Sequence, residues 1–236
     1  MAIFAIADLH LALSNPEKSM EVFGKSWDGY ITRLEESFAE LVSEGDTVLM
    51  PGDISWATYM SKAEEDFKFI DSLPGKKIIG RGNHDYWWTT VKKMEETLKD
   101  MGVTTISLSN HTSFIVEDSI ITGTRAWKLP TDDSFSDEDR KIYEREKIRI
   151  GLCVQALNKE DPEHTKRRIL MLHYPPLTSR VPNTELSEMI EGSGIDLCIY
   201  GHLHGKAHKK VFEGERNGTV YKCVSADYLG FSPVEL

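Results

Sequence analysis

Short apolar segments alternate with longer amphipathic segments through the first half of the chain. Residues 3–7, 47–50 and 77–80 are apolar runs of strand length. Between and after them, apolar residues recur at helical spacing, which predicts helices from Tyr30 to about Gly45, around residues 63–70 and around residues 91–98. This order of strands and helices predicts a largely parallel sheet.

The pattern changes in the second half. Residues 103–106, 113–116 and 120–122 are short strand-like runs with little between them, which favours antiparallel pairing. The segments expected afterwards are a polar loop at 129–139, an amphipathic helix at 142–157, strands at 168–172 and 196–200, a helix at 184–191, and a hairpin in which 206–212 and 219–224 flank Asn217-Gly218. Residues 11–28 are expected to form a long loop. We therefore predict an α/β fold and, because no repeat or linker is visible, a single domain over residues 1–236.

Composition narrows the possible partners. The chain has 236 residues and a formal net charge of −10. That charge disfavours an extended nucleic-acid surface or an anionic membrane surface, since both need a basic face. No apolar run approaches the roughly 20 residues of a membrane-spanning helix, and no signal peptide is visible. The three cysteines have wide, unpatterned spacing, so we expect reduced thiols in a cytoplasmic protein.

Polar groups that can bind metal follow five of the strand-like runs. These groups are Asp8 and His10, Asp53, Asn83, His173, and His202 with His204. Together with His84, which follows Asn83, five of the 8 histidines lie in these short motifs, a concentration that scattered placement would not produce. In an open α/β sheet, residues at the carboxyl ends of the strands face the ligand.

The number and type of these groups indicate two metal ions. Seven candidate ligands exceed the four to six that one transition metal takes, and Asp53 on the central run is the natural bridge. Imidazole, carboxylate and amide ligands without thiolate favour Mn, Fe or Zn. Two divalent ions with the carboxylates of Asp8 and Asp53 would leave a charge of about +2, which suits an anion such as a phosphate ester.

The motifs Asp-x-His, Gly-Asp, Gly-Asn-His-Asp, a strand-end His and Gly-His-x-His occur in this order from Asp8 to His204. This series resembles the calcineurin-like metallophosphoesterase superfamily over nearly the whole chain. The resemblance implies two packed mixed β-sheets flanked by helices, a four-layer sandwich with a dinuclear site at the strand ends.

The resemblance also implies a role for each motif residue. One metal would be held by Asp8, His10, Asp53 and His204, and the other by Asp53, Asn83, His173 and His202. A bridging hydroxide would attack phosphorus in line. By position in the motif, His84 would protonate the leaving oxygen or stabilise the transition state, and Asp85 would orient it; a purely positional role for His84 is the alternative.

Several residues beside these motifs are candidates for substrate contact. Arg81 could bind phosphate or face solvent, and Arg125 follows another strand. Trp87 and Trp127 could line a substrate wall or serve core packing. The segments at 11–28 and 129–139 are long enough to form lids.

We therefore expect a cytoplasmic, metal-dependent phosphohydrolase that cleaves phosphate monoesters or diesters, with small nucleotide-type or other small esters favoured. The alternatives are a phosphoprotein phosphatase, a non-catalytic metal-binding scaffold, and a hydrolase of non-phosphate substrates on the same centre. The oligomeric state is left open by the sequence.

Overall fold

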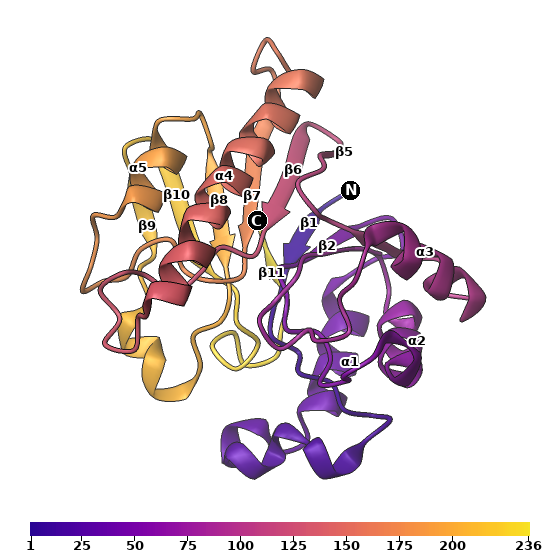
Figure 1. Cartoon of the computed structure of the whole chain (residues 1–236). Helices are drawn as coiled ribbons and strands as arrows, with labels where there is room; N and C mark the ends of the chain where they lie inside the picture. Colours follow the sequence, from indigo (N-terminus) through magenta and orange to yellow (C-terminus); the bar gives the residue numbers. More distant parts are fainter.

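Two β-sheets form the centre of the molecule in the computed structural model, which describes residues 1–236 apart from the side chains of Pro16, Val22 and Phe23 (Figure 1). The first sheet has the order β11-β1-β2-β3-β4. Its strands are β1 (Ile3–Ala5), β2 (Thr47–Met50), β3 (Lys76–Ile79), β4 (Ile106–Leu108) and β11 (Val234–Glu235). All neighbours are parallel except β11, which runs antiparallel to β1.

The second sheet has the order β5-β6-β7-β8-β10-β9. Its strands are β5 (Phe114–Val116), β6 (Ser119–Thr124), β7 (Arg167–Leu172), β8 (Leu197–Tyr200), β9 (Gly214–Arg216) and β10 (Thr219–Cys223). The four inner strands are parallel, and both edge strands pair antiparallel. The two sheets are therefore both mixed.

Side-chain alternation along the strands explains why the sheets stack. In β1 and its extension, Ile3, Ala5 and Ala7 belong to the apolar cluster between the sheets, whereas Phe4 and Ile6 belong to the cluster on the outer face of the first sheet. Successive side chains of a strand point to opposite faces, so a strand that is apolar at every position is buried on both sides.

Helices cover the two outer faces. The first-sheet side carries α1 (Tyr30–Leu41), α2 (Glu64–Ser72) and α3 (Val91–Asp100), and the second-sheet side carries α4 (Asp137–Glu160) and α5 (Glu185–Glu191) (Figure 1). Short 3-10 helices occupy 16–18, 20–23, 25–27, 60–62 and 205–210. The result is the predicted α/β architecture of two packed mixed sheets flanked by helices.

Three local predictions were wrong. The expected strand at 103–106 lies at Ile106–Leu108 and pairs parallel to β3, because it completes the first sheet. Residues 206–212 are largely the 3-10 helix Gly205–Lys210, and the strand that pairs around Asn217-Gly218 is β9. The loop predicted at 129–139 ends early, because Ser136 and Asp139 form a capping box that begins α4 at Asp137.

No helix in the described structure is long and apolar enough to cross a membrane.

Candidate metal centre

The candidate ligands lie in turns at the carboxyl ends of strands from both sheets. Asp8 and His10 follow β1, Asp53 follows β2, and Asn83 follows β3; His173 follows β7, and His202 and His204 follow β8. An isolated parallel bridge between Ala7 and Ser225 connects the two sheets at this end. His10 and His204 meet here although they are 194 residues apart in sequence, as expected for ligands at the strand ends of an α/β fold.

Glycines allow these turns to approach one another closely. A Cβ on Gly82 would lie 2.0 Å from Asp53 Oδ1, and a Cβ on Gly52 would lie 2.4 Å from the Gly82 nitrogen. A Cβ on Gly201 would lie 2.5 Å from Asp8 Oδ2. Each of these three glycines is required because a second turn occupies the space of a side chain. Gly80, by contrast, has ordinary room for a Cβ.

Four of the candidate ligands have left-handed backbone conformations. Asp8, His10, Asp53 and His202 have φ values of 61°, 46°, 52° and 71°. Non-glycine residues adopt this region at a cost, and such residues cluster at functional sites. The fold therefore holds these side chains in a fixed direction at the expense of local backbone energy.

The first group of ligand atoms comes from Asp8, His10 and His204. These three residues each offer an atom within 4.8 Å of the others. His10 Nε2 lies 3.2 Å from His204 Nε2, and His204 Nε2 lies 3.7 Å from Asp8 Oδ1. Asp8 and His10 are almost fully buried. A carboxylate and two imidazoles that converge in this way match the donor set of a transition metal.

The second group of ligand atoms comes from Asp53, His173 and His202, which also each offer an atom within 4.8 Å of the others. His173 Nδ1 lies 3.1 Å from the Pro51 carbonyl oxygen, so this nitrogen donates and Nε2 is left for a ligand role. His173 Nε2 lies 2.8 Å from Asn83 Oδ1 and 3.4 Å from Asp53 Oδ2. The amide of Asn83 thus lies at the second group, as predicted.

Asp53 lies between the two groups. Its Oδ2 is 3.7 Å from His10 Nε2 in the first group and 3.4 Å from His173 Nε2 in the second. Its Oδ1 accepts a hydrogen bond from the His84 amide at 2.8 Å, which fixes the carboxylate. This geometry suits a carboxylate that bridges two ions.

The donor set fits a metal ion, because one of its buried oxygens lacks a hydrogen-bond partner. Among the described residues, Asp8 Oδ1 is buried and accepts no hydrogen bond, and it lies 3.7 Å from His204 Nε2. Buried polar atoms are rarely left unsatisfied in native structures. Two groups of candidate metal-binding residues are therefore present.

Burial shifts the pKa values of the candidate ligands toward their neutral forms. Burial raises the pKa of Asp8 to about 7 and the pKa of Asp53 to about 6. Burial lowers the pKa of His10, His173 and His202 well below the usual value, so these imidazoles are neutral ligands. A bound cation would favour the charged carboxylates and displace their protons.

Asp227 is a contact of the site that the motifs did not predict. Its Oδ1 lies 2.8 Å from His204 Nδ1, and its Oδ2 accepts a hydrogen bond from the Gly205 amide at 3.0 Å. Burial opposes protonation of His204, but the carboxylates of Asp8 and Asp227 raise its pKa to about 9. Asp227 therefore directs Nε2 of His204 toward the first group. It lies 23 residues beyond the last motif, and no local pattern marks it.

His84 lies beside the two groups and belongs to neither. Its ring is 5.6 Å from the ring of His10 and 4.4 Å from the ring of Trp56, between centroids. Within the described structure, His84 Nδ1 is buried and has no hydrogen-bond partner. The half-buried Trp56 ring therefore holds His84 by packing.

Asp85 does not orient His84, and that prediction was wrong. The Asp85 carboxylate accepts hydrogen bonds from the amides of Asp53, Ile54 and Gly82 at 2.7–2.8 Å. It also accepts one from Trp87 Nε1 at 3.1 Å. Asp85 thus connects the turn after β2 to the turn after β3 by hydrogen bonds. Its own side chain is 1% exposed and is fully occupied by these donors.

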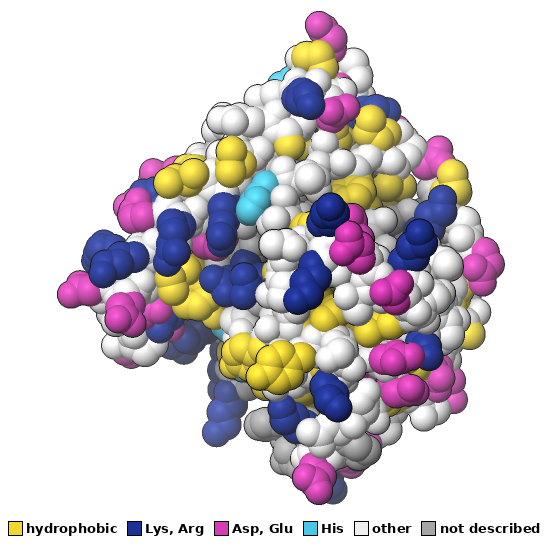
Figure 2. All heavy atoms as spheres, turned by 45° about the vertical axis from the view of Figure 1, so that its right-hand side comes forward, with side chains coloured by type: hydrophobic (Ala, Val, Ile, Leu, Met, Phe, Trp, Pro, Cys, Tyr) yellow, Lys and Arg dark blue, Asp and Glu magenta, His cyan; other side chains and the backbone are white. Residues whose placement is uncertain are grey.

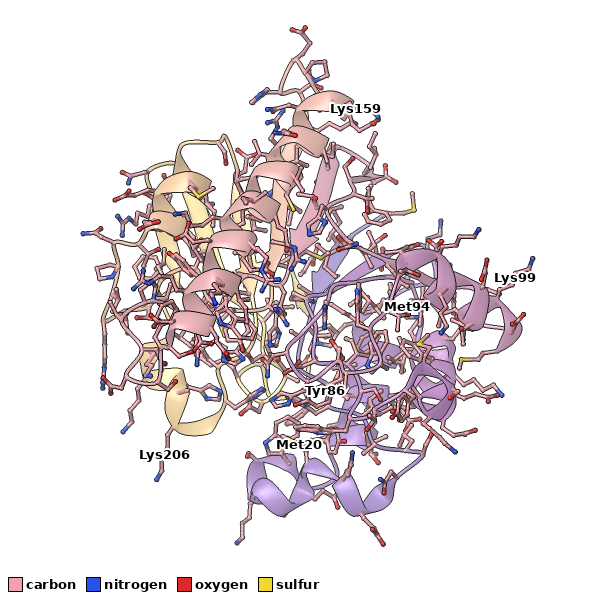
Figure 3. The ribbon with its side chains drawn as sticks, viewed as in Figure 1. Met20, Tyr86, Met94, Lys99, Lys159 and Lys206 are labelled. Carbon is pink, nitrogen blue, oxygen red and sulfur yellow. The ribbon has the colours of Figure 1, made fainter. Side chains whose placement is uncertain are left out.

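Trp87 is a core residue, so of the two roles considered for it core packing is the one that the structure shows, and substrate contact is not. It is 1% exposed and packs edge-on against Phe67, with a centroid separation of 5.0 Å. Tyr86 is the exposed aromatic of this turn, at 61%, and Figure 3 shows it in the lower central part of the molecule. Its ring lies 6.2 Å from that of His84. The turn at residues 86–87 therefore directs Tyr86 outward and Trp87 inward.

Arg81, Arg125 and Trp127 remain partly exposed. The Arg125 carbonyl accepts hydrogen bonds from the amides of His173 and Tyr174, at 3.2 and 2.9 Å. The Arg125 guanidinium lies over the Trp127 ring, 4.3 Å from its centroid. These contacts attach the predicted substrate residues Arg125 and Trp127 to the second ligand group.

The two segments considered as lids lie on different sides of the centre. In the first segment, Trp27 packs against the rings of His10 and His204, with centroids 6.1 and 5.8 Å away. In the second, residues 129 and 131–134 help to line a cavity of about 540 Å³ that also reaches Tyr174 and His202. This cavity adjoins the second ligand group and is large enough for the organic part of a small ester.

Comparison with known proteins agrees with this architecture. The family model described as calcineurin-like phosphoesterase matches residues 1–206. No curated protein matches the sequence. The chain belongs to the calcineurin-like phosphoesterase family.

Solved structures share the fold at low sequence identity. A phosphopantetheinyl hydrolase from Mycobacterium tuberculosis has a TM-score of 0.59 and 13% identity, covering 100% of this chain and 95% of its own. A protein from Thermus thermophilus has a TM-score of 0.54 and 9% identity, covering 99% and 97%. A protein of unknown function from Aquifex aeolicus has a TM-score of 0.50 and 16% identity, covering 99% and 95%.

Proposed function

We propose that this member of the family is a dinuclear metallophosphoesterase that hydrolyses small phosphate monoesters or diesters in the cytoplasm. The observation that carries the proposal is the position of Asp53 Oδ2 between the two ligand groups, 3.7 Å from His10 Nε2 and 3.4 Å from His173 Nε2. A carboxylate shared by two donor groups supports two ions held close together.

The proposed ligands divide into two sets. Asp8, His10, Asp53 and His204 would hold one ion, and Asp53, Asn83, His173 and His202 would hold the other. We propose Mn, Fe or Zn for both positions. When bound, the paired ions supply an activated water and stabilise charge on the phosphoryl oxygens.

The protein's own side chains would then bind the substrate and transfer a proton. His84 lies beside both groups and coordinates neither, so its imidazole is free to protonate the leaving oxygen. Arg81 and Arg125 are candidates for contact with the anionic group of the substrate. Trp127 is a candidate for the wall of the substrate-binding site. The cavity beside His202 would hold the alcohol portion.

Two features support a small ester over a polymer. The net charge of −10 disfavours an extended nucleic-acid interface, and the cavity of about 540 Å³ matches a small organic group. A phosphoprotein side chain is the second candidate, because the cavity is open to solvent. The M. tuberculosis neighbour is named as a hydrolase, which supports hydrolytic use of this fold.

The test is a panel of aryl phosphate monoesters and diesters, screened with Mn, Ni, Zn and Fe. We expect metal-dependent release of the aryl alcohol by the wild type and loss of that activity in Asp53→Asn, which removes the shared charge. A correctly folded, metal-loaded wild type that cleaves no phosphoester would contradict the proposal and favour a binding scaffold. A thioester panel run in parallel would identify a hydrolase of another class.

A further inference from the structure

Three arginines from three different elements lie around one buried carboxylate next to the proposed metal centre. Arg81 follows β3, Arg125 follows β6, and Arg149 belongs to α4. Arg149 Nη1 lies 2.5 Å from Glu146 Oε1, and Arg125 Nη2 lies 3.9 Å from the same oxygen. Arg81 has no carboxylate at ion-pair distance in the described part of the chain. Arg125 and Arg149 therefore share the carboxylate of Glu146, whereas Arg81 interacts more strongly with Asp85 than with Glu146.

The charges of Arg81 and Arg125 are poorly compensated. The Nε atoms of both are buried and, among the described residues, have no hydrogen-bond partner. Burial lowers the pKa of each guanidinium, and the repulsion between Arg81 and Arg125 lowers the pKa of Arg125 further. Partly buried like charges are costly unless an anion lies between them.

Glu146 holds the cluster in place without neutralising it. The Glu146 side chain is fully buried, and its Oε2 accepts hydrogen bonds from Thr124 Oγ1 at 2.9 Å and from the Ala126 amide at 3.0 Å. Ala126 has a left-handed backbone with φ of 57°, which is rare for alanine. Because Arg149 occupies the other oxygen, Arg125 remains available to a ligand.

The cluster is close to the metal centre but separated from it by aromatic rings. The Arg125 guanidinium lies over Trp127, the Trp127 ring packs against Tyr174 at 5.0 Å, and the Tyr174 ring lies 4.0 Å from that of His202, between centroids. Burial raises the pKa of Asp53 and lowers that of His173; the positive charge of Arg125 opposes the first shift and adds to the second. The charge of Arg125 therefore acts on Asp53, which lies between the two ligand groups, and on His173 of the second group.

The face of the molecule in Figure 2 carries side chains of both charges although the chain is acidic overall. Figure 2 shows Lys and Arg side chains gathered over the left and middle of the face that it displays.

We propose that Arg125, assisted by Arg81 and Arg149, forms a second anion-binding subsite for a group of the substrate other than the phosphoryl group that is cleaved. The subsite would take a phosphate or a carboxylate. The inference rests on the proposed function and narrows its substrate class to phosphate esters that carry a second anionic group.

Substrate pairs test the subsite directly. Adenosine 5′-monophosphate and adenosine 3′,5′-bisphosphate share the 5′ ester and differ in one anion, as do phenyl phosphate and carboxyphenyl phosphate. For the metal-loaded wild type we expect a KM about tenfold lower for the member with the second anion. In Arg125→Gln we expect this advantage to fall below about twofold.

The control is Arg145→Gln, which removes an exposed arginine from the same helix as Arg149 and should keep the full advantage. A KM that rises equally for both members of each pair in Arg125→Gln would overturn the proposal. That result would place Arg125 on the phosphoryl group that is cleaved. Thermal unfolding of each variant identifies any loss of folded protein.

Binding of inorganic phosphate to the full-length protein in EDTA separates this proposal from the proposed function. We expect the wild type to bind phosphate and Arg125→Gln to bind it at least about tenfold more weakly. Arg149→Gln should also bind more weakly, because Glu146 would then pair with Arg125. Phosphate binding that depends on Arg125 in a protein that cleaves no ester would refute only the proposed function. Binding that is absent, or unchanged in Arg125→Gln, would refute the subsite.

Discussion

Two carboxylates beside the candidate metal centre have different roles. Asp85 follows His84 directly, yet it accepts hydrogen bonds from four backbone amides and the Trp87 indole, and none from His84. Asp227 is distant in sequence, yet it lies 2.8 Å from His204 Nδ1. The prediction that Asp85 orients its neighbour His84 was therefore wrong, and the histidine that a carboxylate does orient is His204.

Replacement of His84 by Gln should reduce turnover without removing metal. A positioned general acid contributes roughly 10²- to 10⁴-fold to a rate, and His84 belongs to neither ligand group. We expect kcat to fall by about that factor while the metal content per protein stays constant. The measurements are kcat on an aryl phosphate and metal analysis of the same sample. Loss of metal in His84→Gln would show that His84 is a ligand.

Variants of Asp227 should weaken metal binding in a graded way. Removing a carboxylate that orients a metal-binding histidine typically costs about 10- to 100-fold in affinity. We expect that loss in Asp227→Ala, and a smaller one in Asp227→Asn, which keeps an acceptor for His204 Nδ1. Metal titration with a competing chelator measures both. The exposed Asp100→Asn is the control, and equal affinity in all three variants would contradict the role of Asp227.

At the scale of elements, strand-end placement was predictable because both signals are local. A buried strand needs a short apolar run, and a ligand turn needs Asp, Asn or His directly after it, so residues 47–53 and 78–83 could be assigned from the sequence. The pairing partners of short runs are not local. Residues 106–108 pair in parallel with β3, which the sequence did not indicate. Residues 206–212, predicted as a strand, lie largely in the 3-10 helix Gly205–Lys210.

The turn after β3 should not tolerate a side chain at position 82. A Cβ there would lie 2.2 Å from the Asp53 backbone nitrogen, so Gly82→Ala must separate the turns after β2 and β3. We expect a loss of about 3 kcal/mol in the free energy of unfolding, with loss of metal binding. Gly151→Ala, in the middle of α4 with nothing within 4 Å, should instead stabilise by about 1 kcal/mol. Chemical denaturation of both variants gives the comparison.

At the scale of the whole molecule, the centre depends on how the two sheets pack. The first sheet supplies Asp8, His10, Asp53 and Asn83, and the second supplies His173, His202 and His204. Hydrophobic periodicity predicted the strands of both sheets. The prediction that the strands form two sheets packed against each other came from the family resemblance. The contact of Asp227 with His204 is set by the packing of the C-terminal segment against the strand ends, so it required the structure.

Because both sheets contribute ligands, metal removal should destabilise the whole protein, and the effect should depend on pH. In the metal-free protein, burial raises the pKa of Asp8 to about 7 and of Asp53 to about 6. Folded carboxyls then hold protons that the unfolded chain releases near pH 4, so this contribution to stability is lost as pH rises from about 4 to 7. A bound cation instead favours the deprotonated form of these two carboxyls in the folded protein, because it binds the charged carboxylates.

The stabilisation by metal should therefore increase between about pH 5.5 and pH 7.5. His204, whose pKa is raised to about 9 by Asp8 and Asp227 against the effect of burial, must also lose a proton on binding and acts in the same direction. At a metal concentration about 100 times the Kd, we expect about 3 kcal/mol of stabilisation at the higher pH. At the lower pH the same metal concentration should stabilise far less. Thermal unfolding with and without EDTA at the two pH values measures the difference, and equal shifts would mean that metal does not bind through these carboxylates.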